Sequence, residues 1–276
     1  MSGALVELAH VSKTFTRGGL FAARRVQAVA DVNLRLAADK PIILAITGES
    51  GSGKSTLARM ILNIVEPSAG AILFRGRNLR SIRSSAARGA FMRQVQPIFQ
   101  NPFEAFNPLK RLDRYLYITA RRFAGVADMA TAEQRSNEAL HRVGLSLGEI
   151  KERFPHELSG GQLQRFAIAR ALLSNPALIV ADEPVSMVDA SLRMSIATLF
   201  RSLRSELRIS TIYITHDLAT AYYVSDEIII MQKGGIVESG ATRTVLSAPR
   251  HPYSRQLKDA VLSLRRPPGP DSEDSS

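Results

Sequence analysis

The stretch Ile42-Ile-Leu-Ala-Ile-Thr-Gly48-Glu-Ser-Gly-Ser-Gly-Lys-Ser-Thr56 decides the fold of this chain. Its first half is an apolar run that follows Pro41 and predicts a buried strand. Its second half matches G-x-x-x-x-G-K-[ST], the pattern of a phosphate-binding loop, and a helix is expected over 55–65. A strand, this loop and a helix in that order predict a nucleotide site on an α/β sheet.

Within the loop, the glycines let the backbone turn tightly and point N–H groups at phosphate oxygens. Lys54 is expected to reach the β- and γ-phosphates, and the Ser55 hydroxyl to ligate Mg²⁺. The alternative is an ordinary turn rich in small residues, which the strand before it and the helix after it disfavour. The candidate residues for ATP here are Gly48, Ser50, Gly51, Ser52, Gly53, Lys54, Ser55 and Thr56.

A second apolar run, Leu178-Ile-Val-Ala-Asp-Glu183, ends in two carboxylates. Asp182, at the end of a strand, is expected to lie near the magnesium ion. Glu183 is suited to orient or deprotonate the attacking water. Such a charged pair is common at strand ends in α/β proteins, but beside a phosphate-binding loop it predicts hydrolysis.

Two further polar residues follow predicted strands. His216 comes after Thr211–Thr215 and could donate to the γ-phosphate and position water, because parallel strands end at the same edge of a sheet. Gln100 comes after Val95–Phe99 and could contact magnesium or the water. Taken alone, a single histidine is usually structural or on the surface, and Gln100 would be an ordinary loop residue.

The pentad Leu158-Ser-Gly-Gly-Gln162 lies about a hundred residues after the loop. Ser159 is expected to cap a helix over 162–174, with Gly160 and Gly161 allowing close backbone approach at a helix end that favours an anion. A plain capped core helix is the alternative. This second anion-binding end has no obvious phosphate in its own chain, which favours a nucleotide site completed by Ser159, Gly160, Gly161 and Gln162 of a second subunit.

The bulk composition excludes several classes of protein. The chain has 276 residues, 45% of them hydrophobic, and no cysteine, so disulfides, a thiolate nucleophile and a cysteine-based zinc site are excluded. The apolar runs are far shorter than the ~20 residues needed to cross a bilayer. The amino end lacks a basic stretch followed by an apolar core, so no secretory signal is expected. We expect a protein that is soluble by itself.

The net charge of +11 is unevenly distributed, since residues 75–122 hold eleven basic and two acidic side chains. A nucleic-acid surface, a surface held near anionic lipid head groups and an ordinary solvated face are all compatible with this stretch. The basic residues lack regularly interleaved aromatics and any nucleic-acid-binding signature. We therefore expect no nucleic acid as a partner.

Alternating strands and helices organise the rest of the chain into a layered α/β sheet. Thr131-Ala-Glu-Gln134 resembles a capping box that opens a helix through Arg142. The last residues, rich in Pro, Ser and acidic side chains, are expected to form a disordered tail. The predicted strands are 4–9, 28–36, 42–47, 71–74, 95–99, 177–181, 211–215, 227–231 and 235–238, and the later helices are 162–174, 190–207 and 218–224.

Together these motifs resemble the nucleotide-binding subunit of ABC transporters over about residues 4–260. The resemblance implies a P-loop NTPase core sheet with an antiparallel β subdomain, an inserted α-helical subdomain at about 101–170 and a tail at 261–276. It also implies an adenine contact for Phe15, for which a buried core position is the alternative. The aspartate loop Ser186–Asp189 reads Ser-Met-Val-Asp instead of the usual Ser-Ala-Leu-Asp.

Two segments resemble the oligopeptide, dipeptide and nickel importer branch, namely Pro97–Pro108 and His251–Leu257. The resemblance implies a peripheral ATPase on the cytoplasmic face of the membrane that pairs head-to-tail with a like subunit. Two permease subunits would bind the helical subdomain, with Phe103 and Phe106 in the contact groove, and a substrate-binding protein would act indirectly. Whether the partner ATPase is the same or a homologous chain stays open.

The leading hypothesis is therefore an ATPase that drives uptake of peptides or related small solutes. Glu183 and His216 would orient the water, with Lys54 and Gln100 completing the catalytic set and Ser55, Gln100 and Asp182 the magnesium set. The second hypothesis is an ABC-type ATPase acting on nucleic acid or ribosomes, supported by the basic stretch. A scaffold without hydrolysis is disfavoured because every chemical position is filled.

Overall fold

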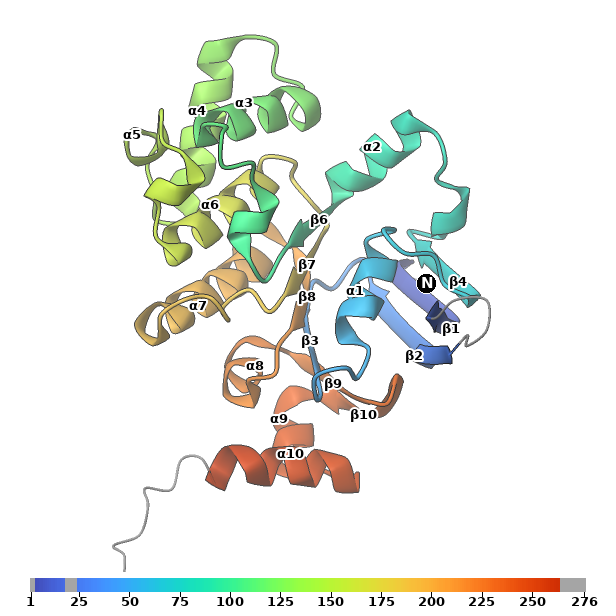
Figure 1. Ribbon diagram of the computed structural model, residues 1–276. Helices are drawn as coiled ribbons and strands as arrows, with labels where there is room; N and C mark the ends of the chain where they lie inside the picture. The colour runs from blue at the N-terminus through green and yellow to red at the C-terminus, as the bar shows by residue number, and fades with distance from the viewer. Residues whose placement is uncertain (1–2, 18–23, 264–276) are drawn as a thin grey trace, which may run out of the picture.

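A six-stranded sheet forms the centre of the molecule, in the strand order β10-β9-β3-β8-β7-β6 (Figure 1). The computed structural model describes residues 3–17 and 24–263. Five strands run parallel, and β10 pairs antiparallel with β9, so the two strands predicted at 227–231 and 235–238 form a hairpin. The strands are β3 (Ile43–Thr47), β6 (Val95–Ile98), β7 (Leu178–Asp182), β8 (Ser210–Ile214), β9 (Glu227–Gln232) and β10 (Gly235–Ala241).

The central strand β3 is buried on both faces, as its unbroken apolar sequence predicts. Because successive side chains point to opposite faces, Leu44 and Ile46 pack on the side of the second sheet. Ile43 packs against the helical side, and Ala45 against the carboxyl-terminal helices. One strand thus ties three groups of core residues together.

The second sheet is antiparallel, in the order β2-β1-β4-β5. Its apolar side packs with Leu57 and Met60 of α1 over the central strands. The elements on this side are β1 (Ala4–Arg17), β2 (Arg24–Ala37), α1 (Lys54–Ile61), β4 (Ala69–Phe74), β5 (Arg77–Asn78), the 3₁₀ turn η1 (Leu79–Ser81) and α2 (Ser85–Gln94).

A group of helices covers the opposite side of the central sheet (Figure 1). Its core holds the fully buried rings of Phe166, Phe200 and Tyr213. The elements are η2 (Pro102–Ala105), α3 (Leu112–Phe123), α4 (Met129–Arg142), α5 (Leu147–Ile150), η3 (Pro155–Glu157), α6 (Gly160–Leu172) and α7 (Ala190–Leu207). The α/β core with an antiparallel β subdomain and a helical insertion is confirmed.

Three helices at the carboxyl-terminal end pack beside β9, namely α8 (Leu218–Val224), α9 (Thr242–Ser247) and α10 (Pro252–Ser263). Helix α10 ends at Ser263 and so extends three residues into the segment predicted as a tail. The disorder expected over the rest of that tail falls on 264–276, outside the described residues.

Several element boundaries differ from the expectations. The capping box at Thr131 is wrong, because helix α4 begins at Met129 and the Asp128 carboxylate accepts the Thr131 N–H at 2.8 Å. Strands β1 and β2 are longer than predicted, since their exposed ends carry polar residues that periodicity alone does not assign to a strand. Helix α1 ends at Ile61 instead of Val65, where Asn63 adopts a left-handed φ of 55°.

Candidate functional site

The parallel strands bring the predicted catalytic residues to one edge of the sheet. In the register, Ile98 of β6 lies opposite Ala181 of β7, and Asp182 lies opposite Ile214 of β8. Ile214 in turn lies opposite Ile46 of β3, two residues before the phosphate-binding loop. Gln100, Glu183, His216 and the loop therefore all follow aligned strand ends.

The phosphate-binding loop is shaped by close contacts with neighbouring strands. A Cβ on Gly48 would lie 2.1 Å from the Met231 carbonyl oxygen, and one on Gly53 would lie 2.2 Å from the Ala28 carbonyl oxygen. Both glycines also have positive φ values, 146° and 103°. Only glycine fits these two positions. A Cβ on Gly51 would meet no atom within 4 Å, so open space adjoins the loop at that point.

The Lys54 ammonium lies folded over the loop. It donates to the Gly48 and Glu49 carbonyl oxygens, both at 2.7 Å, and to Ser52 Oγ at 3.3 Å. Burial lowers the pKa of Lys54, while the carboxylates of Glu183, Asp182 and Glu49 act in the opposite direction. A phosphate in the loop would stabilise this buried cation. Ser50 and Ser55 are exposed beside it, and Thr56 is half-buried.

A hydroxyl and a carboxylate meet where the metal is expected, because Ser55 Oγ donates to Asp182 Oδ1 at 3.3 Å. Burial raises the pKa of Asp182, only partly offset by that hydrogen bond. These hard oxygen ligands suit Mg²⁺, which commonly keeps waters and uses one or two carboxylates plus substrate phosphates. No cluster of three or more His, Cys, Asp or Glu side chains that could hold a metal occurs in the described residues. The residues present fit a cation shared with a bound phosphate.

Glu183 links the two other polar residues of this edge. Its Oε2 accepts a hydrogen bond from Gln100 Nε2 at 3.1 Å, and its Oε1 lies 3.2 Å from His216 Nδ1. Its backbone is left-handed, with φ of 46°, an unfavourable conformation for a side chain of this kind. Its own N–H donates to the Ile214 carbonyl, and its carbonyl accepts from Ser186 N. Strained backbone held by surrounding bonds is typical of functional positions.

The pentad caps helix α6 in the expected way. Ser159 Oγ accepts from Gln162 N at 3.2 Å, and Gln162 Oε1 accepts from Ser159 N at 3.0 Å, which completes a capping box. The glycines are packed within their own chain, since a Cβ on Gly160 would lie 2.9 Å from the Met187 carbonyl and one on Gly161 3.0 Å from Leu192. In the described residues no hydrogen bond joins the pentad to the phosphate-binding loop, and both polar side chains are exposed.

The comparisons with known proteins agree with this geometry. Residues 29–186 match the family model described as ABC transporter. The chain is 38% identical over 254 residues to the dipeptide transport ATP-binding protein DppF of Haemophilus influenzae, covering 89% of this chain and 74% of the relative. The chain belongs to the ABC transporter family. It is an ATP-binding cassette that hydrolyses ATP.

Other relatives of the cassette carry similar names. The oligopeptide transport ATP-binding protein OppF of Haemophilus influenzae is 37% identical, with 93% of this chain and 78% of the relative covered. AppF of Bacillus subtilis, another oligopeptide transport ATP-binding protein, is 36% identical, with 95% and 79% covered. The dimeric post-hydrolysis structure of the cassette MJ0796 bound to ADP and Pi has a TM-score of 0.76 and 27% identity, covering 86% of this chain and 99% of that one.

Phe15 of the cassette lies on the surface, with 39% of its area exposed, so the alternative of a buried core phenylalanine is wrong. The Lys13 ammonium lies 5.1 Å from the centre of its ring. Phe15 pairs across the sheet with Val26 of β2, the strand that approaches Gly53 of the loop at Ala28. An aromatic face is thus presented on the strand next to the one that contacts the loop.

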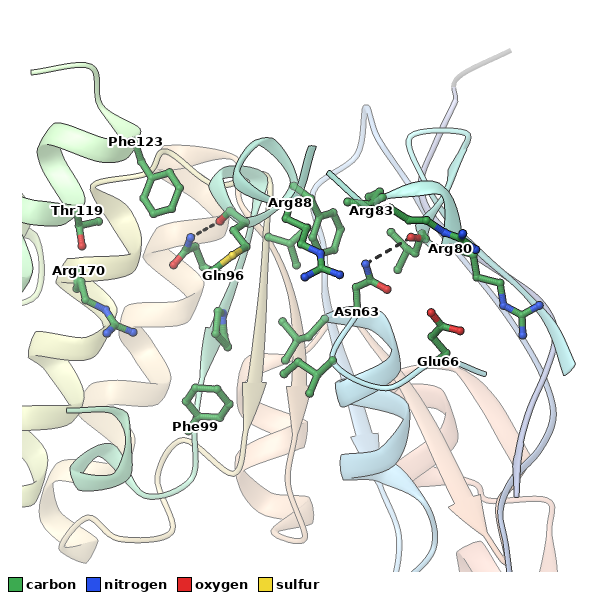
Figure 2. Close-up of a pocket in the computed structure, with 18 of the residues that line it drawn as sticks. Asn63, Glu66, Arg80, Arg83, Arg88, Gln96, Phe99, Thr119, Phe123 and Arg170 are labelled. Carbon is green, nitrogen blue, oxygen red and sulfur yellow. Dashed lines mark hydrogen bonds between the residues drawn. The ribbon is translucent and has the colours of Figure 1, made fainter. Parts of the chain in front are cut away.

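A groove of about 720 Å³ lies between the antiparallel side of the cassette and its helical group. Figure 2 shows Thr119 and Arg170 on one wall, Asn63, Glu66 and Arg80 on the other, and Gln96 between them. Its floor and sides are largely apolar, including Phe99 and Ile118, which are 39% and 62% exposed. The charged residues that line it are Glu66, Arg80, Arg83, Arg88 and Arg170.

Arg170 lines this groove, and no pattern in the sequence indicated a role for it. Its guanidinium lies 4.8 Å from the centre of the Phe106 ring, and burial lowers its pKa. In the described part of the chain no carboxylate pairs with it. Neither Phe103 nor Phe106, the two residues expected in the contact groove, lines this one. Phe106 is buried beneath Arg170, whereas Phe103 is 43% exposed. No described helix is long and apolar enough to cross a membrane.

Proposed function

We propose that this cassette is the ATP-hydrolysing subunit of an importer for peptides or related small solutes. The observation that supports import is the identity of 36–38% to relatives named for dipeptide and oligopeptide transport, over most of both chains. The observation that supports hydrolysis is the meeting of Gln100, Glu183 and His216 beside the loop. The cassette need not contact the cargo, since it supplies only the free energy of ATP.

In the proposed reaction, water attacks the γ-phosphate in line with the leaving oxygen. Glu183 accepts the proton of this water or orients it, and His216 donates to the γ-phosphate. Lys54 donates to phosphate oxygens and stabilises the charge that develops on them. Gln100 holds the Glu183 carboxylate through its hydrogen bond, so that its position depends on whether the site is occupied.

The phosphates are bound by the N–H groups of the loop together with Ser50, Ser52 and Thr56. The adenine ring is bound by Phe15.

Ser55, Asp182 and Gln100 would hold Mg²⁺ together with the phosphates of ATP. The ion, when bound, supplies positive charge that neutralises the phosphate oxygens. The Asp182 carboxylate suits this role. It is half-buried, and in the described residues it accepts one side-chain hydrogen bond, from Ser55, which leaves oxygen lone pairs for the ion.

The second half of the nucleotide site would come from a second cassette, the same or a homologous chain. Support comes from the exposed Ser159 and Gln162, which cap a helix end that favours an anion but contact no phosphate loop of their own chain. MJ0796, the structural neighbour, is dimeric. ATP would lie between the loop of one chain and the pentad of the other.

Two permease subunits would be bound by the pair of cassettes, with a cytoplasmic segment of a permease subunit in the groove of each cassette. The cassettes would then lie on the cytoplasmic face of the membrane. An apolar segment that carries a carboxylate suits the groove, because four arginines line it against one glutamate. Phe99 lines the groove and Gln100, the next residue, contacts Glu183. Movement of a segment in the groove is therefore passed to the catalytic carboxylate. A substrate-binding protein would act through the permease.

Purification of the tagged cassette from its native membranes tests this proposal, with every co-purifying protein identified. Two multi-helix permease subunits are expected, and any binding protein recovered with them can be assayed for cargo. Recovery of DNA-repair factors or ribosomal proteins without a permease would instead support an ATPase acting on nucleic acid or ribosomes. The basic stretch at 75–122 is the feature that favours this alternative.

A further inference from the structure

Helix α10 reaches back to the phosphate-binding loop through Tyr253. The Tyr253 ring is 3% exposed and packs among apolar residues of the core around Ala45, Ile228 and Ile230. Its hydroxyl oxygen accepts a hydrogen bond from the backbone N–H of Glu49 at 2.7 Å. Glu49 is the second residue of the loop, and 204 positions separate the two partners in the sequence.

The peptide group between Gly48 and Glu49 is held at both ends. Its N–H donates to Tyr253, and its carbonyl, that of Gly48, accepts from Lys54 Nζ at 2.7 Å. A peptide group is planar, so holding the N–H also fixes the direction of the carbonyl. The Tyr253 hydroxyl thereby determines where the loop places a partner for Lys54.

The tyrosine is itself fixed by the start of its helix. Glu238 of β10 accepts the N–H groups of Arg250 and His251 at 2.8 and 3.1 Å. His251 Nδ1 accepts the Tyr253 N–H at 3.2 Å. Burial raises the pKa of Tyr253 against the opposing effect of the hydrogen bond from Glu49, so the phenol is neutral at physiological pH.

We propose that Tyr253 is a positioning residue for nucleotide binding, which holds the first peptide group of the phosphate-binding loop and through it Lys54. The carboxyl-terminal helix is then part of the ATP site without contacting ATP. Without the Tyr253 hydroxyl, the Glu49 N–H would lack a partner in this partly buried position. The loop would then sample other orientations of this peptide group. The inference rests on ATP binding alone and stands whether or not the cassette serves an importer.

The test is Tyr253→Phe in the full-length chain, which keeps the ring and removes only the hydroxyl. The dissociation constant for Mg·ATP and the KM are expected to rise about five- to tenfold, the usual effect of one lost hydrogen bond, with a smaller change in kcat. Hydrogen exchange of the peptide that contains residues 48–54 should become faster without nucleotide. Tyr117→Phe is the matched control, since it loses a hydroxyl bond to Glu133 at 3.1 Å from a ring that is 8% exposed, in the helical group.

A second variant, Glu238→Gln, keeps one of the two side-chain oxygens that accept the N–H groups at the start of the helix. It should raise the dissociation constant for Mg·ATP and the exchange rate of the loop, both by less than Tyr253→Phe does. An unchanged dissociation constant in Tyr253→Phe, with or without a lower melting temperature, overturns the proposal, because the tyrosine is then only a core residue. A weaker affinity with unchanged exchange of the loop also overturns it. Failure to find a permease bears only on the importer, since these assays use ATP and the cassette alone.

Discussion

At the scale of single residues, Glu183 combines a strained backbone with two polar partners. The left-handed φ of 46° turns its side chain between Gln100 and His216. A left-handed conformation costs roughly 1–2 kcal/mol for an ordinary residue, and the hydrogen bonds of its own N–H and carbonyl offset this cost. The position of the carboxylate is therefore set by the backbone before any nucleotide arrives.

Glu183→Gln should bind Mg·ATP with nearly the affinity of the wild type but lose turnover by at least about a hundredfold, the usual effect of removing a catalytic base. Glutamine retains the size of the side chain and a carbonyl acceptor for Gln100. ATP binding by calorimetry and phosphate release under saturating ATP measure the two effects. Wild-type turnover in this variant would remove Glu183 from its assigned role.

Asp182→Asn should raise the melting temperature of the nucleotide-free protein while abolishing Mg²⁺-dependent hydrolysis. Burial raises the pKa of Asp182 in the folded state, so ionisation of this carboxyl opposes folding and asparagine avoids that effect. The stabilisation is expected above the raised pKa and should disappear as the pH falls and the wild-type carboxyl becomes protonated.

Thermal unfolding in EDTA at several pH values measures this difference. Asp39→Asn, at an exposed aspartate in the turn between β2 and β3, is the control for the same substitution away from the site. A gain in stability that stays constant at low pH would contradict the assignment to ionisation.

At the scale of elements, Arg170 of α6 lines the groove between α2, β6, α3 and α6. Arg170 stacks on Phe106 and has no carboxylate partner in the described residues. Arg170→Met should keep or raise the melting temperature, by up to about 2 °C, because a half-buried charge without a carboxylate partner in the described residues is replaced by an apolar side chain of similar length. Basal ATPase activity should be unchanged.

The same variant should recover several-fold less permease from membranes, because the acidic group of the partner loses its cation. Arg83→Met, at an exposed position that lines the same groove, is the control and should have a smaller effect. Unfolding of Arg170→Met, or full recovery of the permease, would mean that this arginine serves the fold of the helical group instead.

At the scale of the whole molecule, a nucleotide site shared by two copies makes a specific prediction for mixtures. Lys54→Ala should inactivate the loop and Ser159→Arg the pentad, and each variant alone should be inactive. An equal mixture should recover roughly a quarter of wild-type ATPase activity, because half of the dimers are mixed and each has one intact site. Steady-state hydrolysis against the mixing ratio measures this, and a site contained within one chain would show no recovery.

The order of motifs along the chain was enough to predict the α/β core and the residues that meet at the sheet edge, whereas the helical insertion was implied by the resemblance to ABC transporter subunits. Parallel strands that end together make this inference possible, because Gln100, Glu183 and His216 each follow a readable apolar run. Contacts such as that between Tyr253 and Glu49 could not be predicted, since no local pattern relates residues so distant in sequence. The Asp128 cap was missed because Thr131 offered a competing capping signal three residues later.

The outer strand β6 has a consequence for how two cassettes associate. Within the described residues β6 pairs with β7 alone, and it carries Pro97, which has no N–H to offer to an additional strand. Extension of the sheet from one subunit into the next is therefore discouraged at this edge. Two copies that meet at this edge would associate through loops and side chains, and an interface of that kind can separate after each round of hydrolysis without breaking a continuous ladder of backbone hydrogen bonds.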